Sequence, residues 1–117
     1  MPCGIFFHTK FQPGGWPRQG YEAQVNSTHK DPRKTGSVYA TKDVGGAISK
    51  DYHWFQYEVI VKGKTVTMKV DGKVVNEYTE PDGAKPPKYL SEGTIAIQAH
   101  DPGSVVHYRN IMLKVLQ

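Results

Sequence analysis

Short runs of alternating apolar and polar residues follow one another along the chain, and glycine and proline separate them. Alternation with a period of two is typical of β-strands that bury one face. No segment shows a sustained helical period, so we predict an all-β chain. The expected strands are 4–10, 20–27, 37–40, three within 54–80, 93–100 and 104–116.

The stretch from Trp54 to Glu80 carries the clearest pattern. Lys62-Gly63 and Asp71-Gly72 interrupt it between alternating runs, so we expect two-residue turns there and a three-stranded meander. About eight short strands joined by turns favour an antiparallel β-sandwich or jelly roll. A length of 117 residues suits one such domain, spanning residues 1–117.

Several predicted strands have one apolar face and one face of amides, acids and imidazoles. In strand 20–27 the polar face is Glu22, Gln24 and Asn26, against Tyr21, Ala23 and Val25. In strand 93–100 it is Thr94, Ala96, Gln98 and His100, against a predicted core face of Ile95, Ile97 and Ala99. The other expected same-face pairs are Phe6 with His8, and His107 with Arg109. Such rows suit hydrogen bonding to polyols better than the Lys and Thr of an ordinary solvent face, so we interpret them as a binding face.

Charge and cysteine content narrow the function classes. The formal net charge is +4, but the basic residues gather in turns, with no Lys/Arg run interleaved with aromatics. We therefore expect no nucleic-acid partner. The one cysteine, Cys3, cannot form a disulfide within the chain. No apolar run is long enough to cross a membrane, and the start MPCGIFFHTK has no signal-peptide pattern.

Six motifs in order then resemble one family. They are GIFFH, GYEAQV, THKDPRKTGSVY, the meander YEVIVKGK…VDGKVV, IAIQAHDPG and YRNIMLK. Together they resemble the 3-keto-disaccharide hydrolase domain family, a concanavalin-A-like β-sandwich of glycan-degrading bacteria whose members are often periplasmic or secreted. The resemblance implies a concave face that binds mono-, di- or oligosaccharides and, in some members, cleavage of glycosidic bonds by hydrolysis or elimination.

The resemblance also assigns roles to residues of this chain. The acidic strand motif falls on Glu22 and Gln24, the Q-x-H motif on Gln98 and His100, and the late arginine on Arg109. We expect Glu22, His100 and Arg109 to be catalytic and Gln24 and Gln98 to bind substrate. A base of this kind can remove the acidic C2 proton of a 3-keto sugar, and the C1 leaving group then departs.

Further candidates complete the expected site. His8, where many members have arginine, His107 and Trp16 are expected to contact substrate; Trp16 could stack on a sugar ring or only anchor its loop. A second carboxylate is not obvious, although Asp31 and Asp101 are candidates. A divalent metal (Zn, Ca or Mn) could be held by His8, Glu22 and His100, but their spacing alone gives no support.

Two other functions stay open beside the enzyme. The same fold serves non-catalytic carbohydrate-binding modules, and a third reading is an assembly or interaction piece without either activity. Members of the family usually begin several strands before G-[IV]-F-F, and those strands are missing from this sequence. Because an incomplete sandwich exposes strand edges, we expect a homodimer or strand exchange between copies.

Overall fold

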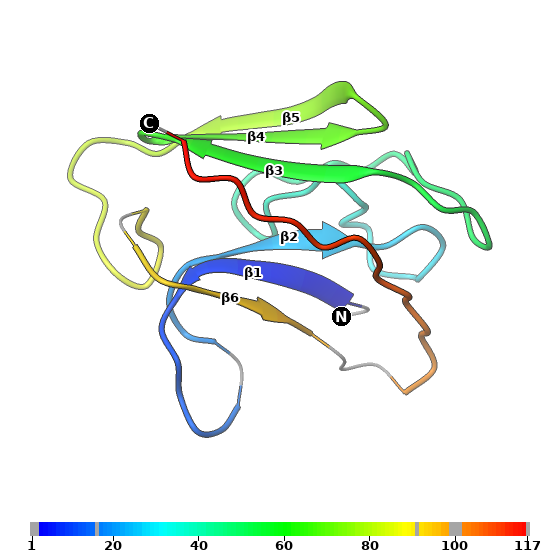
Figure 1. The fold of residues 1–117 in the computed structure, drawn as a ribbon, viewed down its shortest axis with the longest axis horizontal. Coiled ribbons are helices and arrows are strands. Elements are labelled where there is room, and N and C mark those ends of the chain that lie inside the picture. Colours follow the sequence, from blue (N-terminus) through cyan, green and yellow to red (C-terminus); the bar gives the residue numbers. More distant parts are fainter. Residues whose placement is uncertain (1–2, 16, 91, 99–101, 117) are drawn as a thin grey trace.

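A computed structural model describes residues 3–15, 17–90, 92–98 and 102–116 of the chain. It contains six strands: β1 (Cys3–Thr9), β2 (Tyr21–Val25), β3 (Tyr57–Lys62), β4 (Thr65–Val70), β5 (Lys73–Thr79) and β6 (Thr94–Ile97). They form two three-stranded antiparallel sheets, a first sheet in the order β2-β1-β6 and a second in the order β3-β4-β5 (Figure 1). The all-β sandwich predicted from the sequence is therefore confirmed.

The core lies between the two sheets. In β4, Val66, Met68 and Val70 are buried while the residues between them are half-buried, as alternation predicts. Val66 and Met68 meet Phe7 and Tyr21 of the first sheet in one cluster of buried side chains. The remaining buried members of this cluster are Ala23, Val38 and Leu90.

The meander forms as predicted, with a shift of one residue at its first turn. This turn is Gly63-Lys64, because β3 continues through Lys62. Gly63 alone of the two has a positive φ, as a turn with glycine at its first position requires. The second turn is Asp71-Gly72 as expected, and both residues have positive φ, which is the pattern of a type I′ hairpin.

Two of the predicted strands are absent from the described residues. Residues 37–40 contribute only isolated bridges, of Val38 with Ala23 and with Lys42, along the free edge of β2. The predicted last strand, 104–116, has no strand structure at all. Figure 1 shows this segment (orange to red) crossing from the side of the first sheet to that of the second. Its apolar pattern is typical of a strand, but a strand forms only where a neighbour supplies its hydrogen bonds.

The burial predicted for β6 was also wrong. Ile95 and Ile97 occupy the face directed to the core, yet they are 55% and 46% exposed. β6 is the edge strand of the first sheet, so it has a neighbouring strand on one side only among the described residues. Burial of an edge strand depends on what covers it, which alternation does not report.

A β-bulge interrupts β1 at His8. The pairing of β1 with β6 shifts between Phe6 and Thr9, and His8 has φ = 52°. Gly20 and Gly93 both approach the backbone here: a Cβ on Gly20 would lie 2.6 Å from the His8 carbonyl oxygen. The bulge breaks the alternation by which Phe6 and His8 were expected to share a face.

No helix in the described part of the chain is long and apolar enough to span a bilayer.

Candidate active site

The outer face of the first sheet, opposite the second sheet, carries the predicted polar row. Phe6 is paired with Glu22 on one side and Ala96 on the other, and Gly4 is paired with Gln24. The amide N–H of Gln98 donates to the Gly4 carbonyl oxygen over 3.0 Å, so Gln98 continues this row. The prediction that Glu22, Gln24 and Gln98 share one face is consistent with this register.

Glu22 is the buried acid of this face. It is only 4% exposed, and its Oε1 has no hydrogen-bond partner among the described residues. Its side chain occupies the space above Gly4: a Cβ at residue 4 would lie 2.6 Å from Glu22 Cγ and 2.8 Å from Cδ. The absence of a side chain at residue 4 therefore makes room for the Glu22 carboxylate beside β1.

Burial raises the pKa of Glu22 to about 7, because the charged form loses hydration. The ammonium group of Lys88 opposes this rise, and the carboxylate of Asp31 adds to it. A carboxyl group with a pKa near 7 exists in both protonation states at neutral pH. It can accept a proton in one step and return it in another.

Two amide side chains beside Glu22 have free hydrogen-bonding capacity. The Nε2 of Gln24 donates to the Arg33 carbonyl oxygen over 3.3 Å, while its Oε1 has no partner in the described structure. Neither amide atom of Gln98 has a partner there, although both atoms are buried. Buried polar atoms are ordinarily hydrogen-bonded, so these amides are suited to a bound ligand rich in hydroxyl groups.

Lys88 reaches Glu22 from the loop that follows β5. A cavity of about 180 Å³, which we call the Glu22 cavity, is lined by Phe6, Arg18, Glu22, Tyr39 and Lys88, among others. Lys88 Nζ donates to the Tyr39 carbonyl oxygen over 3.2 Å. Desolvation lowers the pKa of Lys88, and the carboxylates of Glu22 and Asp43 oppose that shift. No sequence pattern predicted a role for Lys88, because it lies in a proline-rich loop without periodicity.

One buried carboxylate holds this loop in place. Glu80 Oε1 accepts hydrogen bonds of 2.7 Å from the Tyr21 hydroxyl and from the Leu90 backbone N–H. The Gly20 N–H also donates to the Pro87 carbonyl oxygen over 2.8 Å. The loop that carries Lys88 is thus anchored to the start of β2, next to Glu22.

Tyr39 and Asp31 come from the long connection between β2 and β3. The Tyr39 N–H donates to the Glu22 carbonyl oxygen over 2.9 Å. The Arg33 guanidinium lies 4.8 Å from the centre of the Tyr39 ring and pairs with Asp43 and Asp31 at 3.3 and 3.7 Å. Asp31, one of the two candidates for a second carboxylate, therefore acts on Glu22 electrostatically while paired with Arg33.

Tyr108 is a further polar group near Glu22. Its hydroxyl is buried without a partner among the described residues. Its pKa is raised to about 12, first by desolvation and then by the charges of Cys3 and Glu22. Beneath the sheet, the Tyr57 hydroxyl donates to the Gln24 carbonyl oxygen over 3.0 Å and fixes the strand from the core side.

Other predicted site residues lie elsewhere or outside the described residues. Arg109 and His107 both contact Trp54. The Arg109 guanidinium lies 4.0 Å from the centre of the Trp54 ring, and the centres of the His107 and Trp54 rings are 6.5 Å apart. Their roles stay predictions. His8 is half-buried with a free Nδ1 in the described structure, at 6.1 Å from the Phe7 ring. Trp16, His100 and Asp101 lie outside the described residues.

The proposed metal ligands are only partly described. His8 Nδ1 and Glu22 Oε1 both lack partners among the described residues, which leaves them available for coordination. No group of three His, Cys, Asp or Glu side chains suited to a metal occurs within the described ranges. The third expected ligand, His100, lies outside those ranges, so the metal stays a prediction.

Comparison with known proteins gives one match. The family model described as a 3-keto-alpha-glucoside-1,2-lyase-like domain matches residues 2–114, nearly the whole chain. No curated protein and no solved structure matches the chain significantly. The family resemblance predicted from the motifs is confirmed, and it relates the function of the chain to carbohydrates.

Proposed function

We propose, because the chain belongs to the 3-keto-alpha-glucoside-1,2-lyase-like domain family, that it cleaves glycosidic bonds with Glu22 as the acid–base group. The observation that carries this proposal is a buried carboxyl group with a pKa of about 7, set beside two amides with free hydrogen-bonding atoms. An ordinary glycosidase needs two opposed carboxyl groups. Elimination from a 3-keto sugar needs one base, which fits this site better.

The proposed reaction begins at the C2 proton of a 3-keto glycoside. Glu22 in its ionised form accepts this proton, and the electron pair of the C2–H bond passes toward the C3 carbonyl oxygen. The enolate then collapses: the C3 carbonyl re-forms, the electron pair of the enolate C2=C3 bond becomes the C1=C2 double bond, and the C1–O bond breaks with its electron pair on the leaving oxygen. Glu22 then returns the proton to that oxygen, so atoms and charge balance.

The neighbouring groups have supporting roles in this proposal. Lys88, which lines the Glu22 cavity, would offset the negative charge on the C3 oxygen as the enolate forms. Gln24 and Gln98 would hold sugar hydroxyl groups through their free amide atoms. His100 and Arg109 keep the catalytic roles that the resemblance implies, as predictions.

The test is product release from matched plain and 3-keto glycosides by the wild-type protein and Glu22→Gln. We expect release from the 3-keto glycosides only, formation of an unsaturated sugar, and exchange of the C2 proton with D2O. Glu22→Gln should lose both release and exchange while it still binds the glycoside. Binding without release or exchange by the wild type would instead indicate a carbohydrate-binding module.

A divalent metal is tested in the same assay by chelation. If His8, Glu22 and His100 hold a metal, chelation abolishes release and one metal ion per chain is measured in the purified protein. Unchanged release after chelation, with no bound metal, would show that Glu22 acts without one.

We also propose that two copies associate through the exposed edge of the first sheet. Support comes from apolar side chains exposed on β6 and at the start of the segment that follows it: Ile95, Ile97 and Val105. Edge strands with such surfaces readily pair with another chain. Light scattering after size-exclusion chromatography should give twice the chain mass at micromolar concentration; a monomer throughout would contradict the proposal.

A further inference from the structure

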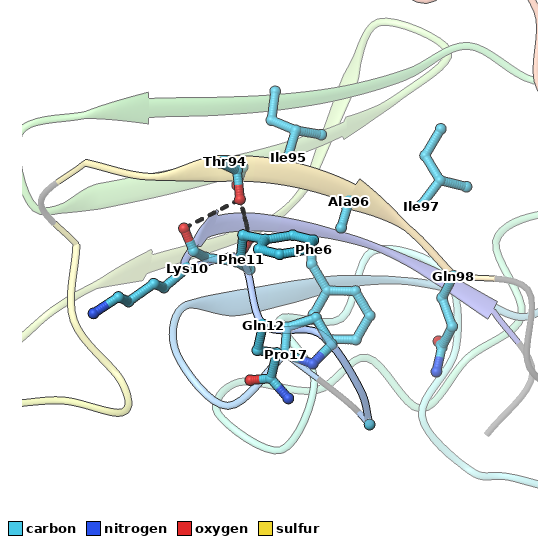
Figure 2. Close-up of a pocket in the computed structure, with 12 residues that line it drawn as sticks. Phe6, Lys10, Phe11, Gln12, Pro17, Thr94, Ile95, Ala96, Ile97 and Gln98 are labelled. Atoms are coloured by element: carbon cyan, nitrogen blue, oxygen red, sulfur yellow. Dashed lines mark hydrogen bonds between the residues drawn. The ribbon is translucent and has the colours of Figure 1, made fainter.

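A second cavity lies next to the Glu22 cavity, on the same outer face. Its volume is about 570 Å³, and residues of β6, β1 and the loop after β1 line it. Figure 2 shows Phe6, Gln12, Pro17 and Gln98 on one side of β6, with Ile95 and Ile97 directed to the other side. Phe6 and Pro17 line both cavities, so the two form neighbouring parts of one surface.

Most polar side chains around this second cavity already have partners. The hydroxyl groups of Thr9 and Thr94 are 2.9 Å apart and hydrogen-bonded to each other. Gln12 donates to the Gly14 carbonyl oxygen over 2.6 Å and accepts from the Arg18 N–H over 3.1 Å. These groups are held within the protein, so they offer little to the hydroxyl groups of a second sugar.

This cavity therefore offers a ligand hydrocarbon, one amide and the exposed side chain of Lys10, whose ammonium group extends away from Phe6 and Gln98 (Figure 2). Its apolar wall includes Phe6, Phe11, Pro17 and Ala96. Gln98 lies at its edge with both amide atoms free among the described residues. Ligand sites of this composition hold apolar or aromatic groups and orient them through few polar contacts. A sugar placed here would lose hydrogen bonds to water without replacement.

We infer that the second cavity binds an apolar, aromatic leaving group of a glycoside whose sugar ring occupies the Glu22 cavity. This inference rests on the proposed function and names the substrate class of that site. The bond to be cleaved then lies beside Phe6, where the cavities meet. The free amide of Gln98 is suited to donate a hydrogen bond to the leaving oxygen.

The test compares phenyl and methyl glycosides of the same 3-keto sugar. Calorimetry measures their dissociation constants on Glu22→Gln, and initial rates on the wild type give kcat/KM. Burial of a phenyl ring against this wall should strengthen binding roughly tenfold or more over methyl. Equal dissociation constants for the two glycosides would overturn the inference.

Variants of cavity residues test whether the preference for the phenyl glycoside arises in the second cavity. Ala96→Leu fills the second cavity and should remove the phenyl preference while leaving binding of the methyl glycoside unchanged. Phe11→Ser, at a rim residue that is 81% exposed, should weaken the preference without disturbing the core. Val74→Ser, a matched exposed apolar position on β5, is the control and should keep the full preference. A preference that survives both Ala96→Leu and Phe11→Ser would refute this placement.

Binding and turnover separate the two proposals. If phenyl binding is preferred and depends on Ala96 while no glycoside is cleaved, the second cavity binds the aromatic group as inferred and the proposed function fails. If both glycosides are cleaved with equal kcat/KM and equal affinity, the proposed function holds and the inference fails.

Discussion

Replacement of Glu22 by glutamine should stabilise the fold above neutral pH while it removes activity. The Glu22 carboxylate is buried, and desolvation raises its pKa from 4.5 to about 7. The folded state therefore holds this proton more tightly than the unfolded chain. The contribution to folding stability is complete below about pH 4.5, declines as the pH rises, and is lost above pH 7.

The size of this effect follows from the two pKa values. The difference between 4.5 and about 7 corresponds to about 3 kcal/mol of unfolding free energy. Glutamine has nearly the same shape and no charge, so Glu22→Gln should recover about 2–3 kcal/mol at pH 8. In a domain of this size, that gain raises the melting temperature by roughly 10 °C.

Urea unfolding at pH 4 and pH 8 measures the effect. At pH 4 the two proteins should unfold at nearly the same urea concentration, because Glu22 is protonated in both states or nearly so. Asp82→Asn is the control: Asp82 is exposed and Lys64 lowers its pKa, so its neutralisation should give no gain at pH 8. Equal midpoints for wild type and Glu22→Gln at pH 8 would refute the claim that the carboxylate is desolvated.

Other predictions test the surroundings of the acid. Gly4→Ala should cut product release at least tenfold, because the new methyl group displaces the Glu22 side chain; Gly45→Ala, where a methyl group meets open space, should leave it unchanged. Tyr21→Phe removes one donor to the buried Glu80 carboxylate and should lower the unfolding free energy in urea by about 1–3 kcal/mol; an unchanged midpoint would contradict this. The kcat/KM for a 3-keto glycoside should rise with pH around a midpoint near 7, since Glu22 must be ionised to act as a base. A flat profile from pH 5 to pH 9 would exclude Glu22 as that base.

Alternation predicted the parts of the fold whose partners are close in sequence. The meander from β3 to β5 follows directly from it, because hairpin neighbours supply the pairing. It failed for 104–116 and for the burial of Ile95 and Ile97, since both depend on whether a distant segment covers an edge. A pattern of apolar residues shows which side chains are suited to burial, whereas the topology decides which of them are buried.

Strand alternation likewise predicted some residues of the candidate site and missed others. Glu22 and Gln24 lie on β2 and Gln98 directly follows β6, so period two was enough to assign them to one face. Lys88 and the Asp31–Arg33 pair come from irregular loops, which the Glu80 anchor, the Gly20–Pro87 hydrogen bond and the turn hydrogen bonds hold beside the acid. No local spacing in the sequence encodes those long-range contacts.

The close fit of the Glu22 side chain over Gly4 has an evolutionary consequence. Neither position can change alone without cost, because a side chain at residue 4 collides with a long acid at residue 22. A path to a larger residue 4 must first shorten or lose the acid, and with it the proposed reaction. The two positions should therefore show strong epistasis: Gly4→Ala should be harmful beside glutamate and nearly neutral beside alanine at residue 22. A lineage with a larger residue at position 4 would have lost the proposed reaction and could keep the sandwich as a binding domain.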